Sequence, residues 1–164
     1  MRIRPYQNKD FDSISQWITD ERSHALWCAN LIPYPLEKKG FDDLLQQAEE
    51  RFEDSPFVAT TYDGKVVGFF CFSVNLSTNE GMLKFVVIDN TIRNKGYGCE
   101  MLKLAVKYAF EIAKADAVHL NVFPENLGAK NCYLKVGFRE RILTENAFSF
   151  KDESWGRCNM IITK

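Results

Sequence analysis

The stretch from Phe85 to Lys114, FVVIDNTIRNKGYGCEMLKLAVKYAFEIAK, restricts the possible folds of this chain more than any other part of the sequence. Its β-branched start is typical of a strand, and it continues through polar turn residues and two glycines into a helical pattern. We expect this helix to span Glu100 to Lys114 and the next strand to be AVHLNVF, from Ala117 to Phe123. A strand, a helix and a strand in this order join parallel neighbours by a right-handed crossover. The sheet should therefore be mixed, with parallel pairing in its middle.

The spacing of apolar residues predicts the remaining helices and strands. The Glu100–Lys114 helix should bury one face, made of Leu102, Ala105, Val106, Ala109 and Ile112. A helix is expected at Asp10 to Thr19, with Phe11, Ile14, Trp17 and Ile18 on one face, and another at Phe41 to Phe52, with Leu44, Leu45, Ala48 and Phe52 as its apolar stripe. The expected strands are Met1 to Pro5, two runs flanking the turn at Asp63 and Gly64, Met82 to Asp89, Arg139 to Thr144 and Trp155 to Thr163. A short helix ending at Gly137 precedes the last two strands. Because no linker or repeat interrupts this order, we expect one domain over residues 1–164.

Composition narrows the class of protein. The 164 residues are 46% hydrophobic and 26% charged, which is typical of a folded domain. The net charge of -1 gives no basic field for nucleic acid. Five cysteines, an odd number without a C-x-x-C pair, argue against a disulfide framework and against a zinc site, so no metal is expected. With no signal-peptide pattern and no apolar run that could span a bilayer, we expect a cytoplasmic protein that does not contact membranes.

The glycine junction is compatible with two structures. A Walker loop is excluded because G-x-x-x-x-G-K-[ST] does not occur, and Met101 stands where the third glycine of a dinucleotide loop would pack. What is left is RNKGYG at the start of a helix, where free N–H groups and the helix dipole attract anions. The alternative is a turn with solvated basic residues, and the junction alone does not distinguish the two.

Two motifs in the chain together resemble those of the GCN5-related N-acetyltransferase (GNAT) family. RNKGYG fits the pattern [QR]-x-x-G-x-G/A between a strand and a long helix. Downstream, NLGAKNCYLKVGF fits N-x-x-A-x-x-x-Y-x-x-x-G-F at Asn126, Ala129, Tyr133, Gly137 and Phe138. The resemblance implies an α+β (α/β/α) GNAT fold. Its mixed, mostly antiparallel sheet has six to seven strands, a central parallel pair splayed for acetyl-CoA, and helices on both faces.

The resemblance also implies where acetyl-CoA binds. The backbone of Val86, Val87 and Ile88 should pair with the pantetheine arm, although these residues could equally form a plain buried strand. The pyrophosphate should lie against the glycine junction, whose residues are Arg93, Asn94, Lys95, Gly96, Tyr97, Gly98 and Cys99. Asn126 and Asn131 should lie near the arm, with helix capping and solvation as their respective alternatives. Cys99 is expected to contribute backbone and not a nucleophile, because the family transfers the acetyl group directly.

Catalytic roles follow from the same resemblance. The Ile88 N–H is the expected donor to the tetrahedral oxyanion, and Tyr133 is the expected general acid, with a core tyrosine as the alternative reading. Many relatives carry a glutamate base on the strand matching Ala117–Phe123, but here Asn121 stands at that site, and an amide cannot accept the proton. His119, Glu80 and a relaying water are open alternatives. Asn121 would then bind the acceptor or that water.

The acceptor is not identified by the sequence. Trp27 and Tyr34 lie in a stretch with two prolines that suits a shaped lid, and we expect them to contact the acceptor, with core packing as the alternative for Trp27. The favoured function is transfer of an acetyl group from acetyl-CoA to a primary amine of a small molecule. A protein N-terminal or lysine acetyltransferase and a non-catalytic acyl-CoA sensor are the alternatives. A homodimer through the last strands is open.

Overall fold

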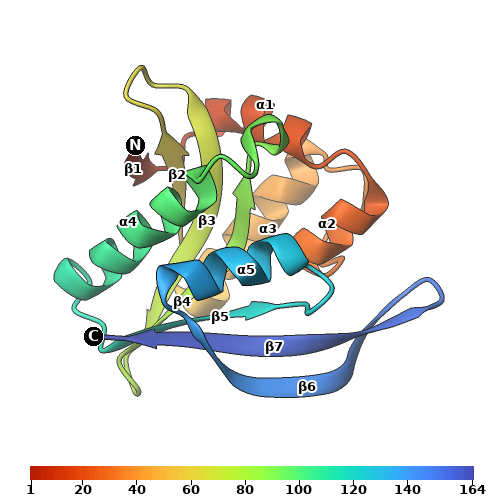
Figure 1. The fold of residues 1–164 in the computed structure, drawn as a ribbon. Helices are drawn as coiled ribbons and strands as arrows, with labels where there is room; N and C mark the ends of the chain where they lie inside the picture. The colour runs from red at the N-terminus through yellow and green to blue at the C-terminus, as the bar shows by residue number, and fades with distance from the viewer.

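A seven-stranded sheet in the order β1-β2-β3-β4-β5-β7-β6 runs through the computed structural model, which describes residues 1–164 (Figure 1). The strands are β1 (Arg2–Pro5), β2 (Ser55–Thr60), β3 (Val66–Asn75), β4 (Glu80–Ile88), β5 (Ala117–Val122), β6 (Arg139–Phe150) and β7 (Glu153–Thr163). The α-helices are α1 (Phe11–Ile14), α2 (Glu21–Cys28), α3 (Lys38–Phe52), α4 (Tyr97–Glu111) and α5 (Leu127–Val136). The expected α+β class and mixed sheet are confirmed, since β4 and β5 are its only parallel neighbours.

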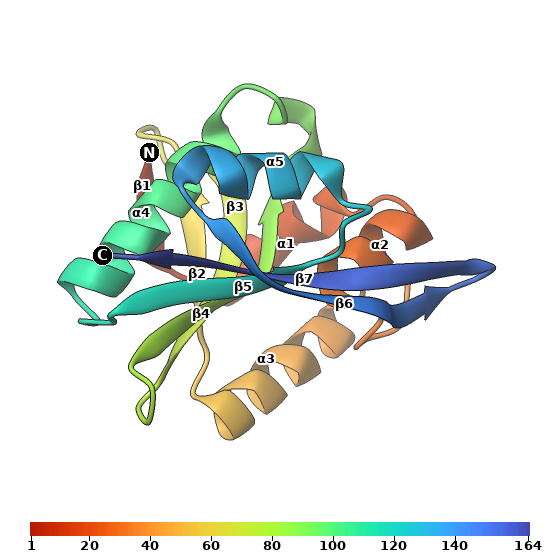
Figure 2. The ribbon, with the colours of Figure 1, turned by 60° about the horizontal axis from the view of Figure 1, so that its bottom comes forward.

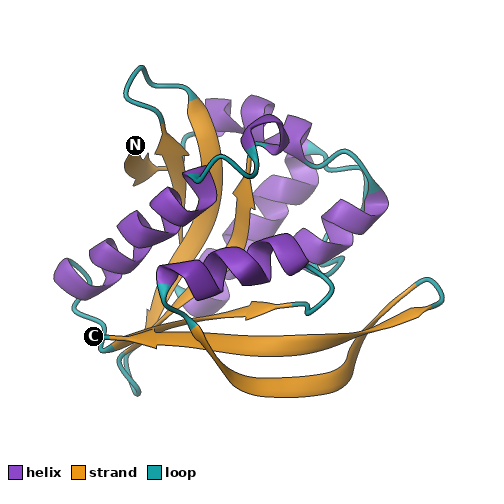
Figure 3. Cartoon of the chain, viewed as in Figure 1, coloured by secondary structure: helices purple, strands orange, loops and turns teal.

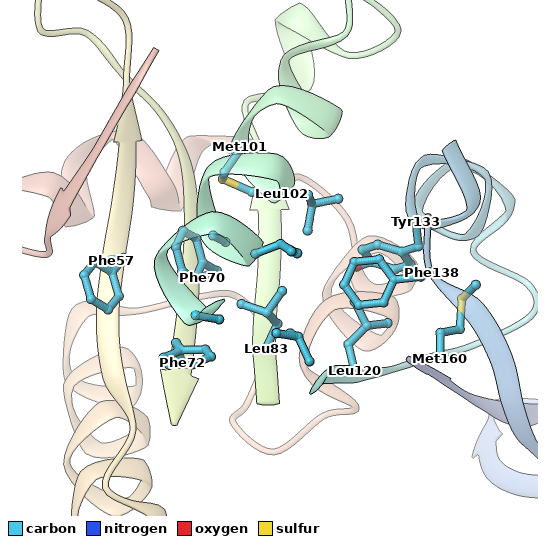
Figure 4. Close-up of a cluster of buried hydrophobic side chains, with 14 of the residues drawn as sticks. Phe57, Phe70, Phe72, Leu83, Met101, Leu102, Leu120, Tyr133, Phe138 and Met160 are labelled. Carbon is cyan, nitrogen blue, oxygen red and sulfur yellow. The ribbon is translucent and has the colours of Figure 1, made fainter. Parts of the chain in front are cut away.

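Helices cover both faces of the sheet (Figures 2 and 3). Helices α4 and α5 lie on one face, where Met101, Leu102 and Tyr133 join the larger apolar cluster. Figure 4 shows these side chains meeting Leu83 and Leu120 from the central strands. Helices α1 and α3 cover the other face, and Phe41 of α3 is fully buried there. The two layers hold the central strands between them.

The parallel pair separates halfway along β4. The pairing of β4 with β5 runs from Glu80 opposite Ala117 to Leu83 opposite Leu120 and stops there. Beyond this point β4 carries a bulge, because Lys84 pairs with Cys71 and Val87 with Phe69, so two residues of β4 stand opposite one of β3. Phe85 has a positive φ of 52° in the bulge, which is uncommon for a residue with a side chain. The second half of β4 therefore diverges from β5.

The bulge is held from α2. The indole N–H of Trp27 donates a hydrogen bond of 2.9 Å to the carbonyl oxygen of Phe85. The same indole stacks on Phe41 with ring centroids 6.3 Å apart. Because α3 packs Phe41 against the sheet, the direction of the bulge is fixed by α2 and α3 together.

Several expected boundaries are corrected by the structure. Helix α4 starts at Tyr97, three residues before the expected Glu100, and ends at Glu111, which leaves Ile112 67% exposed instead of buried. The expected Asp10–Thr19 helix is divided into two 3-10 turns, Asn8–Asp10 and Ser15–Trp17, on either side of α1, although its apolar face is buried as expected. Strands β6 and β7 form a longer hairpin than expected. None of the helices is both long and apolar enough to cross a membrane.

Phe41 and Phe52 provide a matched pair for measuring the packing under β4. Phe41→Ala should lower the free energy of unfolding by about 3–5 kcal/mol, because it opens a cavity among Tyr6, Phe11, Trp27 and Phe69. Phe52 is 59% exposed and lies on the same helix, so Phe52→Ala should cost about 1 kcal/mol or less. Urea denaturation of both variants measures the difference, and equal losses would contradict the assignment of Phe41 to the core.

Candidate functional site

A cleft with a volume of about 470 Å³ opens where β4 leaves β5. Its walls come from the end of β4, the start of α4, the start and middle of α5, and α2. Of the residues predicted from the sequence, those that line it are Trp27, Val86, Val87, Ile88, Arg93, Asn94, Gly96, Gly98, Cys99, Asn126, Asn131 and Tyr133. The divergence of the two strands thus brings both sequence motifs to one cavity.

The glycine junction forms one end of the cleft. Gly96 is the N-cap of α4 with φ of 87°, a conformation that glycine adopts without steric cost. The first helical N–H to donate within α4 is that of Glu100, which reaches the Gly96 carbonyl at 3.0 Å. The N–H groups of Tyr97, Gly98 and Cys99 therefore have no partner inside the helix, which is the arrangement of an anion site. Lys95 and the ring of Tyr97 do not line the cleft.

The turn before this junction is fixed by Asp89. Its side chain accepts hydrogen bonds from the N–H and the hydroxyl of Thr91, at 2.9 and 2.7 Å, and lies 3.4 Å from the Lys65 ammonium. Burial alone would raise the pKa of Asp89, but these hydrogen bonds and the Lys65 charge hold it below its usual value. The carboxylate is thus ionised at neutral pH and keeps the loop after β4 in place.

Met101 sits where a dinucleotide loop would have its third glycine. It is fully buried and lies directly above Gly68 of β3, where an added Cβ would be only 2.5 Å from the Met101 sulfur. Methionine therefore fills the space between α4 and the sheet. This packing agrees with the exclusion of a dinucleotide loop from the sequence.

Two thiols join α4 to α5 at the edge of the cleft. The sulfurs of Cys99 and Cys132 are 2.9 Å apart, and both cysteines are free. Burial and the neighbouring Cys99 raise the pKa of Cys132 to about 12, so this thiol stays protonated at neutral pH. A protonated thiol is a poor nucleophile, so Cys132 is not suited to form an acyl-enzyme, and the expected direct transfer stays a prediction.

Tyr133 stands where two cavities meet. It is 5% exposed and packs edge-on against Phe138, with ring centroids 5.9 Å apart. Burial and the nearby Cys132 raise the pKa of Tyr133, so the phenol keeps its proton at neutral pH. It lines the cleft described above and also a second cavity of about 330 Å³. The ring belongs to the core, and the residue also lines both cavities, while its role as general acid stays a prediction.

The second cavity is formed by α2 and the turn after it, by the bulge of β4, and by the end of β5. It shares Leu26, Trp27, Val86, Asn126 and Tyr133 with the first. Asn126 lies at their junction and caps α5 by accepting a hydrogen bond of 3.3 Å from the Ala129 N–H. Asn121 lines the second cavity, and its side-chain oxygen accepts a hydrogen bond of 3.0 Å from Asn159.

The two ionisable candidates for the general base lie outside both cavities. Arg141 binds both carboxylate oxygens of Glu80 at 3.0 Å. His119 lies 4.0 Å from Glu80, and its Nδ1 accepts a hydrogen bond of 3.2 Å from the side-chain N–H of Asn159. Burial, with the Arg141 charge, lowers the pKa of His119, so this ring is neutral at pH 7. Together with Asn159, these side chains form a network of four on the sheet.

Several lining residues were missed from the sequence. Ser23 and Leu26 line the first cleft beside Trp27, which a helical i, i+3, i+4 stripe on α2 would have indicated. Phe123 and Arg157 line the second cavity, and only the pairing of β5 with β7 brings them together.

Tyr34, expected at the acceptor, lines neither cavity, and its hydroxyl donates a hydrogen bond of 3.1 Å to the Thr19 carbonyl. No group of three or more His, Cys, Asp or Glu side chains is arranged to hold a metal ion.

Comparison with known proteins places this site in a family. The model of the acetyltransferase (GNAT) family matches residues 6–138, which include both motifs. The chain therefore belongs to the GNAT acetyltransferases, and its expected class, an N-acetyltransferase that uses CoA chemistry, is confirmed.

Individual relatives agree with this class. An uncharacterized N-acetyltransferase of Methanocaldococcus jannaschii is 28% identical over 144 residues, which cover 87% of this chain and 81% of the relative. The spermine/spermidine N(1)-acetyltransferase of Bacillus subtilis is 29% identical over 101 residues, 58% of this chain and 66% of that one. The spermidine N-acetyltransferase of Vibrio cholerae, solved with CoA and spermine, superimposes with a TM-score of 0.82 at 18% identity, over 99% of this chain and 94% of that structure. This last likeness confirms the fold.

Proposed function

We propose that this chain transfers the acetyl group of acetyl-CoA directly to a primary amine of a small molecule, at the junction of its two cavities. One observation carries the proposal: Tyr133, a protonated phenol, lies between a cleft that ends in a helix N-terminus and a separate cavity with room for an acceptor. The curated relatives from Bacillus subtilis act on small amines by name, which supports a small acceptor.

The first cleft suits acetyl-CoA along its whole length. The N–H groups at the start of α4, with Arg93 beside them, would receive the pyrophosphate, because helix N-termini favour anions. The backbone of Val86, Val87 and Ile88 is unpaired on the β5 side, since pairing with β5 ends at Leu83. It is therefore free to pair with the pantetheine arm as an added strand would.

The transfer itself requires three steps that the site can perform. The Ile88 N–H would stabilise the oxyanion that forms when the amine attacks the thioester carbonyl. As this intermediate collapses, the C–S bond breaks and Tyr133 would donate its proton to the leaving thiolate. The phenol is suited to this step because its raised pKa keeps it protonated beforehand.

Deprotonation of the acceptor would proceed through water. A lysine-type amine costs about 4–5 kcal/mol to deprotonate at neutral pH, so a proton path is needed. The cavities are lined by no carboxylate and no imidazole, while Glu80 is bound by Arg141 and His119 lies on the sheet surface. Asn121 would hold the relaying water or the acceptor, since its amide can bind both but cannot take the proton.

The proposal also covers the location of the enzyme, its oligomeric state and its partners. We place it in the cytoplasm, where acetyl-CoA is available to it, and as a homodimer that pairs through the exposed residues of the long β6–β7 hairpin. Its acceptors are small amines, with no role for nucleic acid, in keeping with a net charge of -1. No metal takes part in the proposed steps.

Replacing one hydroxyl tests the proposed function. Tyr133→Phe should lower kcat by about 100-fold or more with saturating acetyl-CoA and amine, because general acid catalysis is typically worth that much. CoA binding, measured by calorimetry, should stay within about twofold, since the ring still packs. Tyr108→Phe is the control and should leave thiol release unchanged, because Tyr108 lies in the last turn of α4 and lines neither cavity. Undiminished turnover of Tyr133→Phe would remove Tyr133 from the mechanism, and absence of CoA binding by the unmodified enzyme would refute the proposal.

The base assignment is tested with the two ionisable residues outside the cavities. His119→Gln and Glu80→Gln should each keep kcat/KM within about threefold, because neither side chain reaches the acceptor. The logarithm of kcat/KM should rise with pH until the acceptor amine is deprotonated, without an inflection from His119. A fall of 100-fold in either variant would identify that residue as the base in place of water.

A further inference from the structure

The charges around the second cavity are unlike those that a polyamine would require. Thirteen of its 17 lining residues are hydrophobic, and none is Asp or Glu. Its only charged lining residues are Lys84 and Arg157, both cationic. A polyamine carries several ammonium groups, each of which would need a carboxylate or carbonyl in a cavity of this size.

Only one of the two cations is free. The Lys84 ammonium lies 2.9 Å from both oxygens of Asp54, which is 3% exposed, and stands 4.1 Å from the ring centroid of Phe52. The charge of Lys84 is therefore balanced by Asp54, which follows the end of α3. Arg157 forms no ion pair in the structure, although carboxylates occur elsewhere on the same hairpin.

Two carboxylates near Arg157 and α2 are already bound to other cations. Glu153 pairs with Arg22, and Glu21 at the start of α2 pairs with Lys151 at a distance of 2.7 Å. Glu125 precedes Asn126 in the loop after β5 and forms no ion pair, and its buried Oε2 has no hydrogen-bond partner, but the residue lines neither cavity. The guanidinium of Arg157 thus remains the one unbalanced charge at the wall of the acceptor cavity.

Strand pairing places Arg157 where an acceptor would be bound. On β7 it is opposite Thr144 of β6 and one residue from Cys158, which pairs with Val122 at the end of β5. Arg157 therefore lies beside the end of β5, and it lines the same cavity as Tyr133. A guanidinium binds a carboxylate through two parallel hydrogen bonds and fixes its direction.

We propose that the acceptor is a primary amine that also carries a carboxylate and an apolar body, and that Arg157 binds the carboxylate. The apolar body lies against Leu26, Phe85 and Phe123, which line the same cavity. The amine then points inward, toward the junction at Tyr133. This inference rests on the proposed function and specifies its substrate class, which differs from the polyamines named for the relatives.

Three acceptors, compared in a thiol-release assay with acetyl-CoA, distinguish an amine that carries a carboxylate from a simple amine and from a polyamine. Phenylalanine has the carboxylate, phenethylamine lacks only that group, and spermidine is a polyamine. The unmodified enzyme should show kcat/KM for phenylalanine at least tenfold above that for either of the others. A higher value for spermidine or for phenethylamine would overturn the proposal.

Variants of Arg157 test the residue itself. Arg157→Gln should lower kcat/KM for phenylalanine by at least tenfold while leaving phenethylamine within about threefold. Arg157→Glu should reverse the order so that spermidine becomes the better acceptor. Arg139→Gln removes an exposed charge from the same hairpin outside the cavity and should keep the unmodified order. An unchanged order in Arg157→Glu would overturn the role of Arg157.

The assay also separates this inference from the function on which it rests. If phenylalanine is not a substrate but another amine is acetylated, the substrate class is wrong and the acetyltransferase stands. If CoA does not bind and no amine releases thiol, the proposed function fails as well. Calorimetry with CoA on every variant shows that the cofactor cleft is intact.

Discussion

The bulge in β4 is the constraint on which the site depends. One extra residue at Phe85 turns the strand away from β5, and the Trp27 indole holds the bulged carbonyl at 2.9 Å. Without this divergence β4 and β5 would pair along their full length, and both cavities would be closed. A conformation with positive φ at Phe85 has a cost, and the stacking of Trp27 on Phe41 helps to offset it.

The divergence also determines which groups can meet. The strand–helix–strand connection carries the chain from β4 into α4, so the free N–H groups of the helix start lie beside the unpaired backbone of Val86 to Ile88. Helix α5 then crosses the open end of the pair and brings Tyr133 to the junction of the cavities. Unpartnered N–H groups at a helix start, an unpaired strand edge and a protonated phenol are thus brought together by a single departure from regular pairing.

Local patterns predicted most of this fold and many of the residues that line the two cavities. The parallel pair, the glycine junction and Tyr133 carry signals within a few residues of sequence. The parallel pair is confirmed, and residues of the junction and Tyr133 line one cleft, while their roles stay predictions. Helix ends were less predictable. Gly96 caps the start of α4 through a positive φ, which the sequence alone does not specify, and Ile112 is exposed because the helix ends at Glu111. The wall of the second cavity could not be predicted, because Arg157 and Phe123 are brought together only by the pairing of β5 with β7.

The central claim is that the space opened by the bulge binds CoA. Amide hydrogen exchange with and without CoA tests it most directly, because it reports on backbone groups one segment at a time. On addition of CoA, exchange should slow in residues 86–88 and 94–99, while the amides in the outer half of the β6–β7 hairpin should be unaffected. Unchanged exchange in both segments, or slowing confined to the hairpin, would contradict the account.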